Sequence, residues 1–160
     1  MTELWSWRID GRVGAARISE LLAETIGGPV MPLDPLAAGS LPVGGLLCDI
    51  WYVPGAFPTA VDCYAPPEDL DELPVTAEFA RRLGRRVLLP DDTLDPGRHL
   101  LCAPDGTIRP VHLDVTDTDA GPLLANLRPC TTDGPRCHGR GHCHRSRWAP
   151  DSVLPALAAA

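Results

Sequence analysis

The 160-residue chain contains no lysine and no glutamine, so all 14 of its basic residues are arginine. Together with the many alanine, glycine and proline residues, this bias is typical of proteins from GC-rich bacterial genomes. The apolar runs are far shorter than the roughly 20 residues that a membrane-spanning helix needs, so no membrane span is predicted. The opening stretch MTELWSWRIDGR also lacks the basic region and apolar stretch of a secretory signal.

These absences favour a cytoplasmic protein whose six cysteines are kept reduced. Hydrophobic residues make up 44% of the chain, which excludes wholesale disorder. A chain of this length forms one domain by default and buries about two-thirds of its unfolded surface. It therefore needs no metal or disulfide merely to fold.

Charge is distributed unevenly along the chain. Residues 1–127 carry 9 Arg against 19 Asp and Glu, a net charge of −10, whereas residues 128–160 carry 5 Arg against 2 Asp, a net charge of +3. The acidic body argues against general nucleic-acid binding, because it would repel the phosphate backbone. The same negative field attracts a basic protein partner, although moderate acidity also serves solubility alone.

Apolar periodicity predicts an α+β fold. Alternating or continuous apolar residues predict strands, and apolar residues three or four positions apart predict helices. The predicted order is β-α-β-β-α-β, which matches the split βαβ, ferredoxin-like arrangement, and a hairpin around PDG (104–106) extends its sheet. The predicted elements are strands at 3–9, 46–53, 59–65, 86–90, 99–103 and 107–115, and helices at 15–26 and 75–83.

The remaining segments are assigned by composition. Residues 29–45 are rich in proline and glycine and are predicted to form a long loop. Residues 122–128 are predicted to form one or two helical turns. Residues 1–127 are interpreted as one α+β domain, and residues 128–160 as a tail packed on it, with a weak helix at 151–160.

The tail holds the most specific chemical pattern in the chain, CHGRGHCH (137–144), with one further cysteine upstream. Zinc prefers about four thiolate or imidazole ligands in a tetrahedron, and the intervening glycines let the backbone wrap around an ion. We therefore predict a Zn²⁺ site, structural rather than catalytic. Its ligands are drawn from Cys130, Cys137, His138, His142, Cys143 and His144.

Spacing leaves the zinc ligand set open. One tetrad is Cys130, Cys137, His142 and His144, and the other combines Cys130, Cys137 and Cys143 with one histidine. No C-x2-C knuckle is present, so the pattern matches no standard zinc finger. The alternatives are a disulfide module, a reactive thiol whose pKa is lowered by nearby arginines and histidines, and a solvated tail.

Acidic residues cluster in three segments of the body, EDLDE (68–72), PDD (90–92) and DVTDTD (114–119). The last segment lacks the glycine and glutamate that an EF-hand loop requires, so a calcium loop of that type is excluded. We expect the three segments to form one negative face that binds a partner. The candidate partner-binding residues are Asp69, Asp71, Glu72, Asp91, Asp92, Asp114, Asp117 and Asp119.

Residues 79–115, FARRLGRRVLLPDDTLDPGRHLLCAPDGTIRPVHLDV, run as a helix, a short strand, an acidic proline-containing loop and a hairpin. This stretch resembles small acidic bacterial proteins of the immunity or antitoxin type, which neutralise a toxin by binding it. The resemblance covers under a quarter of the chain and does not include the Cys/His tail. It implies a binding function without naming a site residue.

No G-x-S-x-G, P-loop or G-x-G-x-x-G motif occurs in the sequence, so no catalytic or cofactor-binding residue is nominated. We expect a non-catalytic protein-binding module, an immunity- or antitoxin-type inhibitor that engages a basic protein through an acidic face. One alternative is a zinc-dependent enzyme that activates water. Another is a zinc-containing regulator that binds nucleic acid through the arginine-rich tail beside Trp148.

The zinc prediction is tested by the metal content of the purified protein and by its melting curve. We expect about one zinc ion per chain, as a single tetrahedral site requires. Chelation should lower the melting temperature, because metal that binds only the folded state adds to its stability. Metal-free protein whose melting curve ignores the chelator would contradict the prediction.

Overall fold

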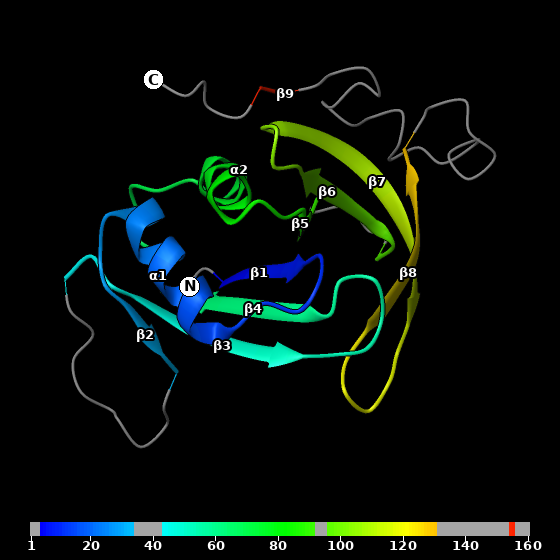
Figure 1. Cartoon of the computed structure of the whole chain (residues 1–160), viewed down its shortest axis with the longest axis horizontal. Coiled ribbons are helices and arrows are strands. Elements are labelled where there is room, and N and C mark those ends of the chain that lie inside the picture. Colours follow the sequence, from blue (N-terminus) through cyan, green and yellow to red (C-terminus); the bar gives the residue numbers. More distant parts are fainter. Residues whose placement is uncertain (1–3, 34–42, 92–95, 131–153, 156–160) are drawn as a thin grey trace.

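The computed structural model describes residues 4–33, 43–91 and 96–130, together with the backbone of residues 154–155. These parts of the chain form one mixed β-sheet with helices packed on one of its faces (Figure 1), which confirms the predicted α+β class. The elements in chain order are β1 (Leu4–Ile9), α1 (Ala15–Ile26), β2 (Val30–Pro32), β3 (Leu46–Tyr52), β4 (Thr59–Tyr64), α2 (Glu72–Leu83), β5 (Val87–Pro90), β6 (Arg98–Cys102), β7 (Thr107–Thr116), β8 (Leu123–Pro129) and β9 (Leu154–Pro155).

The strand order shows how these elements fit together. The sheet runs β2-β3-β4-β1-β5-β6-β7-β8, with β9 paired to the start of β7. Strand β1 lies between β4 and β5 and is antiparallel to both, and β3 is antiparallel to β4. Helix α2 connects β4 to β5 and packs beside α1, which follows β1.

The sheet is larger than the sequence predicts. The predicted loop 29–45 contains β2, which is parallel to β3. The helical turns predicted for 122–128 are wrong, because β8 occupies that segment and pairs with β7. Strand β7 is 10 residues long and offers β8 a whole edge, so tertiary pairing overrides a weak local pattern. Near the end of the chain, β9 pairs with β7 inside the segment predicted as a weak helix.

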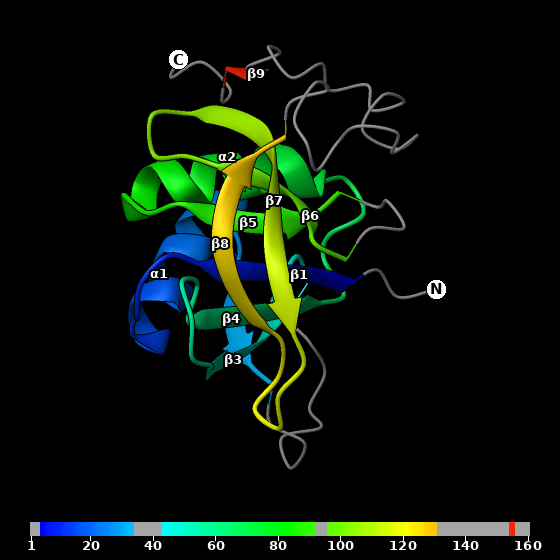
Figure 2. The same ribbon diagram turned by 90° about the vertical axis from the view of Figure 1, so that its right-hand side faces the viewer.

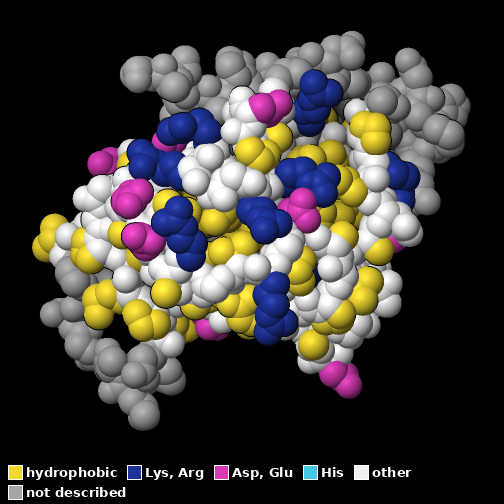
Figure 3. All heavy atoms as spheres, viewed as in Figure 1, with side chains coloured by type: hydrophobic (Ala, Val, Ile, Leu, Met, Phe, Trp, Pro, Cys, Tyr) yellow, Lys and Arg dark blue, Asp and Glu magenta, His cyan; other side chains and the backbone are white. Residues whose placement is uncertain are grey.

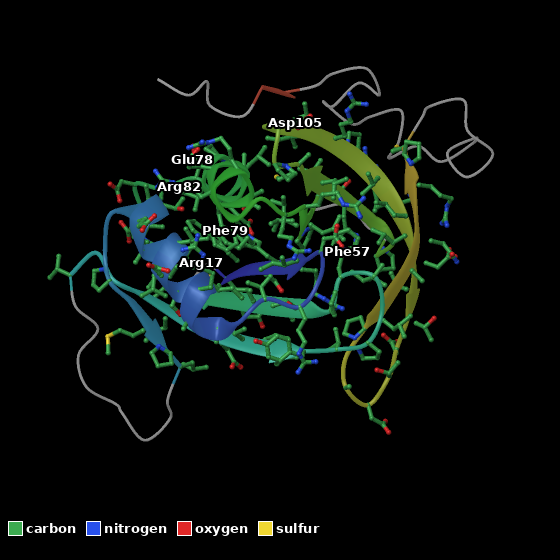
Figure 4. All side chains as sticks on the ribbon, in the orientation of Figure 1. Arg17, Phe57, Glu78, Phe79, Arg82 and Asp105 are labelled. Atoms are coloured by element: carbon green, nitrogen blue, oxygen red, sulfur yellow. The ribbon has the colours of Figure 1, made fainter. Side chains whose placement is uncertain are left out.

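Alternation in β1 builds the main core. Trp5, Trp7 and Ile9 are buried on the helix-covered face, while the residues between them turn to the other face. The ring centroids of Trp5 and Trp7 lie 6.0 Å apart, and Trp7 lies 5.5 Å from Phe79 of α2. Figure 4 shows Phe79 pointing from α2 toward the sheet. These rings fix the position of α2, since burying each such side chain contributes about 1.5–3 kcal/mol.

The helices end where glycine lets the backbone turn. Helix α1 presents Ile18, Leu21 and Leu22 to the core at helical spacing. Both α1 and α2 stop at a glycine with φ of 69°, Gly27 and Gly84, whose backbone N–H bonds back to the last turn. This left-handed conformation costs glycine nothing in steric energy, because it has no Cβ.

A second core lies on the opposite face of the sheet. Strands β7 and β8 cross the other strands steeply and curl over that face (Figure 2). Phe57, from the β3–β4 connection, lies between β1 and this hairpin (Figure 4) and is fully buried. It packs with Leu88, Val111, Leu113 and Leu124. The hairpin therefore covers part of the face that the helices leave open.

Arg8 ties the β7–β8 hairpin to the sheet. Its Nε donates a hydrogen bond to the Phe57 carbonyl oxygen at 2.9 Å, and its Nη1 donates to the Pro122 carbonyl oxygen at 2.8 Å. The Ala56 N–H adds a bond to the Leu124 carbonyl oxygen at 3.1 Å. Burial lowers the pKa of Arg8. An arginine remains charged at neutral pH despite such a shift, so both bonds are charge-assisted.

Alanine substitutions at two glycines test how closely the β3–β4 connection approaches β8. Gly55 and Gly121 both have φ of 110°, so alanine introduces similar backbone strain at each. A Cβ at Gly55 would lie 2.8 Å from the Leu124 carbonyl oxygen, whereas at Gly121 the nearest atom would be Val53 Cγ1 at 3.5 Å. We expect Gly55→Ala to cost about 1–3 kcal/mol more unfolding free energy than Gly121→Ala. If urea unfolding shows that both variants lose the same unfolding free energy, the close approach of Gly55 to β8 is contradicted.

Candidate functional site

The three predicted acidic segments do not share one surface. Asp69 and Asp71 are exposed in the loop before α2, and Asp117 and Asp119 are exposed in the turn between β7 and β8. Figures 1 and 2 show α2 and that turn at opposite ends of the molecule. Asp92 lies outside the described residues. The acidic loops are therefore separate features.

Two of the predicted partner-binding acids make internal contacts instead. Glu72, in the first turn of α2, accepts a hydrogen bond from Nε1 of the buried Trp7 at 2.9 Å. The Asp91 carboxylate is buried and forms an ion pair with the buried guanidinium of Arg98. A buried carboxylate cannot belong to an exposed acidic face, so Asp91 does not contribute to one. Its charge instead balances that of Arg98 inside the domain.

Asp114 is engaged within the β7–β8 hairpin. Its carboxylate accepts hydrogen bonds from Arg128 at 2.9 Å and from Asn126 at 2.7 Å. Asn126 has φ of 55°, a left-handed conformation that asparagine adopts more readily than most residues. These contacts hold the two strands together where the β7–β8 register shifts. Because Arg128 balances the Asp114 charge, this residue attracts a basic partner only weakly.

An acidic pair that sequence reasoning did not predict lies on the sheet face opposite the helices. Asp49 of β3 and Asp62 of β4 are directly opposite each other in the antiparallel register. Cys48 and Cys63 lie beside them in sequence and belong to the helix-covered core, so alternation turns both carboxylates to the open face. Asp49 is exposed and Asp62 is half-buried. The available signal was one aspartate inside each apolar strand, LLCDIWY and TAVDCY.

The environment of this pair raises the pKa of one carboxyl group. Ser6 of β1 donates a hydrogen bond from Oγ to Asp62 Oδ1 at 2.6 Å. Burial raises the pKa of Asp62, the Ser6 bond lowers it, and the Asp49 charge raises it, with a net upward shift. Like charges directly opposite on neighbouring strands destabilise a sheet. The fold therefore carries an electrostatic cost that a cation between the two carboxylates would relieve.

Aromatic side chains flank the acidic pair. Tyr64 lies two residues beyond Asp62 on β4, and Trp51 lies two residues beyond Asp49 on β3, so both share its face. Burial, followed by the charges of Asp62 and Asp49, raises the pKa of the Tyr64 phenol. We call Ser6, Asp49, Trp51, Asp62 and Tyr64 the acidic sheet face. Carboxylates beside aromatic rings form a suitable environment for a guanidinium or ammonium group.

Arginine side chains are spread widely over the surface. Figure 3 shows them over the helices and over the strands on the visible side of the molecule. Arg17 pairs with Glu20 at 2.9 Å, and Arg82 pairs with Glu78 at 2.7 Å. Figure 4 shows Arg82 and Glu78 side by side. Within the described parts of the chain, no arginine forms an ion pair with the carboxylates of the acidic sheet face. The negative charge of Asp49 and Asp62 is therefore available to a partner.

The predicted zinc ligands are described in only one case. Cys130 follows β8, is buried, and donates its backbone N–H to the Pro110 carbonyl oxygen at 3.0 Å. In the described ranges, no three His, Cys, Asp or Glu side chains are grouped as metal ligands. The other five predicted ligands lie outside those ranges: Cys137, His138, His142, Cys143 and His144. The zinc site thus stays a prediction.

Comparison with known proteins finds no matching family model, no similar curated protein and no similar solved structure. Neither helix of the described chain is long and apolar enough to cross a membrane.

The raised pKa of Asp62 predicts a pH-dependent effect of Asp62→Asn. The folded state holds a proton on Asp62 more tightly than the unfolded chain, so this contribution to stability is full below pH 3.8 and is lost as pH rises through the folded pKa. At neutral pH the variant lacks the repulsion from Asp49. We expect it to be more stable than wild type by about 0.2–1 kcal/mol in urea unfolding, toward the lower value because solvent screens the pair.

Asp105→Asn provides a control of opposite sign. Asp105 accepts hydrogen bonds from the Thr107 backbone N–H at 2.9 Å and from its hydroxyl at 2.8 Å, and these bonds lower the pKa of Asp105. Its contribution to stability is present above pH 3.8 and is lost as pH falls through the lowered value. Asp105→Asn should therefore be less stable than wild type at neutral pH. Destabilisation by both substitutions would contradict repulsion at Asp62.

Proposed function

We propose that this chain is a non-catalytic protein-binding module that binds a basic partner protein through the acidic sheet face. The observation that carries the proposal is the placement of Asp49 directly opposite Asp62, with both side chains on the face away from the helices. Paired like charges lower the stability of a folded domain, and binding sites often contain groups that cost stability in the unbound protein. A cationic group from a partner reverses this cost.

The expected contact is an arginine or lysine side chain of the partner, placed against the two carboxylates. A guanidinium can hydrogen-bond to both acids at once, and Tyr64 and Trp51 provide ring surfaces beside it. Arg8 and the β7–β8 hairpin bound this face on one side. The partner therefore meets an acidic sheet surface that the hairpin bounds on one side, which suits an extended protein segment.

Toxin neutralisation is the proposed biological role. The resemblance of residues 79–115 to immunity- and antitoxin-type proteins supports it, and such inhibitors act by occupying a basic surface of their target. We also propose that the strands β3-β4-β1-β5, together with α1 and α2, form a ferredoxin-like unit. Its strand order, antiparallel pairing and adjacent helices support that classification.

We also propose that the segment 128–160 binds Zn²⁺ and packs on the domain formed by residues 1–127. Strand β8 runs to Pro129 beside β7, and β9 pairs with the start of β7. Both ends of the Cys/His segment are thereby held next to one strand, which reduces the entropy that metal binding must overcome. The zinc-dependent enzyme and the nucleic-acid-binding regulator are less favoured, because neither uses the acidic sheet face.

The proposed function is tested with an extended peptide of alternating arginine and valine, titrated into the protein in a calorimeter. Asp49→Asn combined with Asp62→Asn should weaken binding at least tenfold, since a hydrogen bond to a charged group contributes about 1.5–3 kcal/mol. Added salt should weaken wild-type binding more than binding by the variant.

A matched control changes the net charge equally on the helix side of the molecule. Glu20 and Glu24 are exposed on α1, and their pairs with Arg17 and Arg82 are of the surface type that contributes little. Glu20→Gln combined with Glu24→Gln should leave peptide affinity within about twofold of wild type, because salt largely screens a charge change at this distance from the acidic sheet face. Equal losses in the two double variants would show a net-charge effect and refute a defined site.

A further inference from the structure

Two buried thiols lie directly behind the acidic pair. Cys48 of β3 and Cys63 of β4 are opposite each other in the register, one position from Asp49 and Asp62, and their sulfur atoms are 3.4 Å apart. Residues directly opposite on antiparallel strands have Cα atoms about 4.5–5.5 Å apart. Disulfide-bonded cysteines have Cα atoms about 4.4–6.8 Å apart. The backbone geometry therefore already fits a disulfide bond.

The core around the two thiols holds them in place. Cys48 is 3% exposed and Cys63 is 0% exposed, so both side chains lie within the packed core. On one side, Cys63 is opposite Trp5 of the central strand β1. On the other side, Cys48 is opposite Pro32 of β2, a strand of only three residues at the edge of the sheet. Opening of this short edge strand gives a small oxidant a route to the pair.

We propose that Cys48 and Cys63 are a modification site at which hydrogen peroxide forms an intramolecular disulfide bond. One sulfur attacks a peroxide oxygen, the O–O bond breaks, and a sulfenic acid forms with release of hydroxide. The second sulfur then attacks the sulfenic sulfur and displaces its hydroxyl group. The two thiol protons leave with the two displaced oxygens as two water molecules. Peroxide gains the two electrons that the sulfur atoms lose.

The protonation of the Cys63 thiol limits how fast this residue reacts. The hydrogen bond with Cys48, followed by burial, raises the pKa of Cys63. Because the thiolate is the nucleophile, attack by Cys63 is slow at neutral pH and accelerates as pH rises. Once it has formed, the bond is enclosed by the same core, which slows its reduction by external thiols. The pair thus responds to sustained oxidation.

The disulfide bond also acts on the acidic sheet face, a consequence that rests on the proposed function. It joins β3 to β4 at the register position next to Asp49 and Asp62, and so fixes the two carboxylates opposite each other. A face that is already ordered loses less entropy when a partner binds. The oxidised protein is expected to bind the arginine–valine peptide several-fold more tightly than the reduced protein.

The test uses the full chain, treated with hydrogen peroxide after reduction and removal of the reductant. Unreacted thiols are alkylated in denaturant, and the protein is cut with a protease that cleaves before aspartate. This cleavage separates Cys48, in peptide 34–48, from Cys63, in peptide 62–68. We expect the two peptides to be joined, with a mass lower by two hydrogen atoms, and to separate on reduction. Two alkylated peptides after full peroxide exposure would overturn the proposal.

Cys102 supplies a matched control within the same core. It is fully buried, burial raises the pKa of its thiol to about 12, and among the described residues no other sulfur contacts it. Cys102→Ala should leave the joined peptides unchanged, whereas Cys48→Ala should leave Cys63 unlinked. A Cys63 linked to Cys102 or to the tail would refute the assigned pairing.

The two proposals fail independently. Formation of the bond is read from peptide masses alone, without any partner. If the disulfide forms and the peptide binds neither redox form, the modification site stands and the proposed function fails. If the peptide binds and the cysteines resist oxidation, the proposed function stands and the modification site fails.

Discussion

The register between β3 and β4 is the constraint on which the rest of the structure depends. It places Cys48 against Cys63 under the helices and Asp49 against Asp62 on the opposite face. A slip of one residue in either strand would turn a carboxylate into the apolar core. Burying an unpaired charge costs several kcal/mol, far more than the repulsion tolerated on the open face. The apolar core thus determines where the charges of the candidate site lie.

The second core determines how much of that face stays open. Phe57 and the β7–β8 hairpin pack over part of the sheet, and Arg8 bonds to carbonyl oxygens on both sides of the contact. Gly55 permits the close approach, because a side chain there would meet the β8 backbone. The hairpin covers part of the face opposite the helices and leaves the acidic sheet face open beside it. Stability and binding therefore depend on the same packing, and a loosened hairpin would alter both.

Sequence reasoning located acids by their density, and density proved a poor guide to an exposed acidic surface. Glu72 and Asp91 come from the densest segments, yet one bonds to Trp7 and the other pairs with Arg98. Charged residues that fall near a core are retained only where a partner compensates their burial. Asp49 and Asp62 each stand alone in an apolar strand, and an isolated charge inside a strand is the less expected feature.

The sequence by itself determined the α+β class, most of the helices and strands, and the alternation in β1, because these follow from local periodicity and glycine stops. It also showed the Cys/His pattern of the tail. Only the tertiary structure decided that β8 is a strand, that the Asp91 side chain is buried, and that Asp49 faces Asp62. Each of these depends on residues far apart in the chain meeting across a sheet. No local pattern records which strand edges pair or in which register, because that choice minimises the free energy of the whole core.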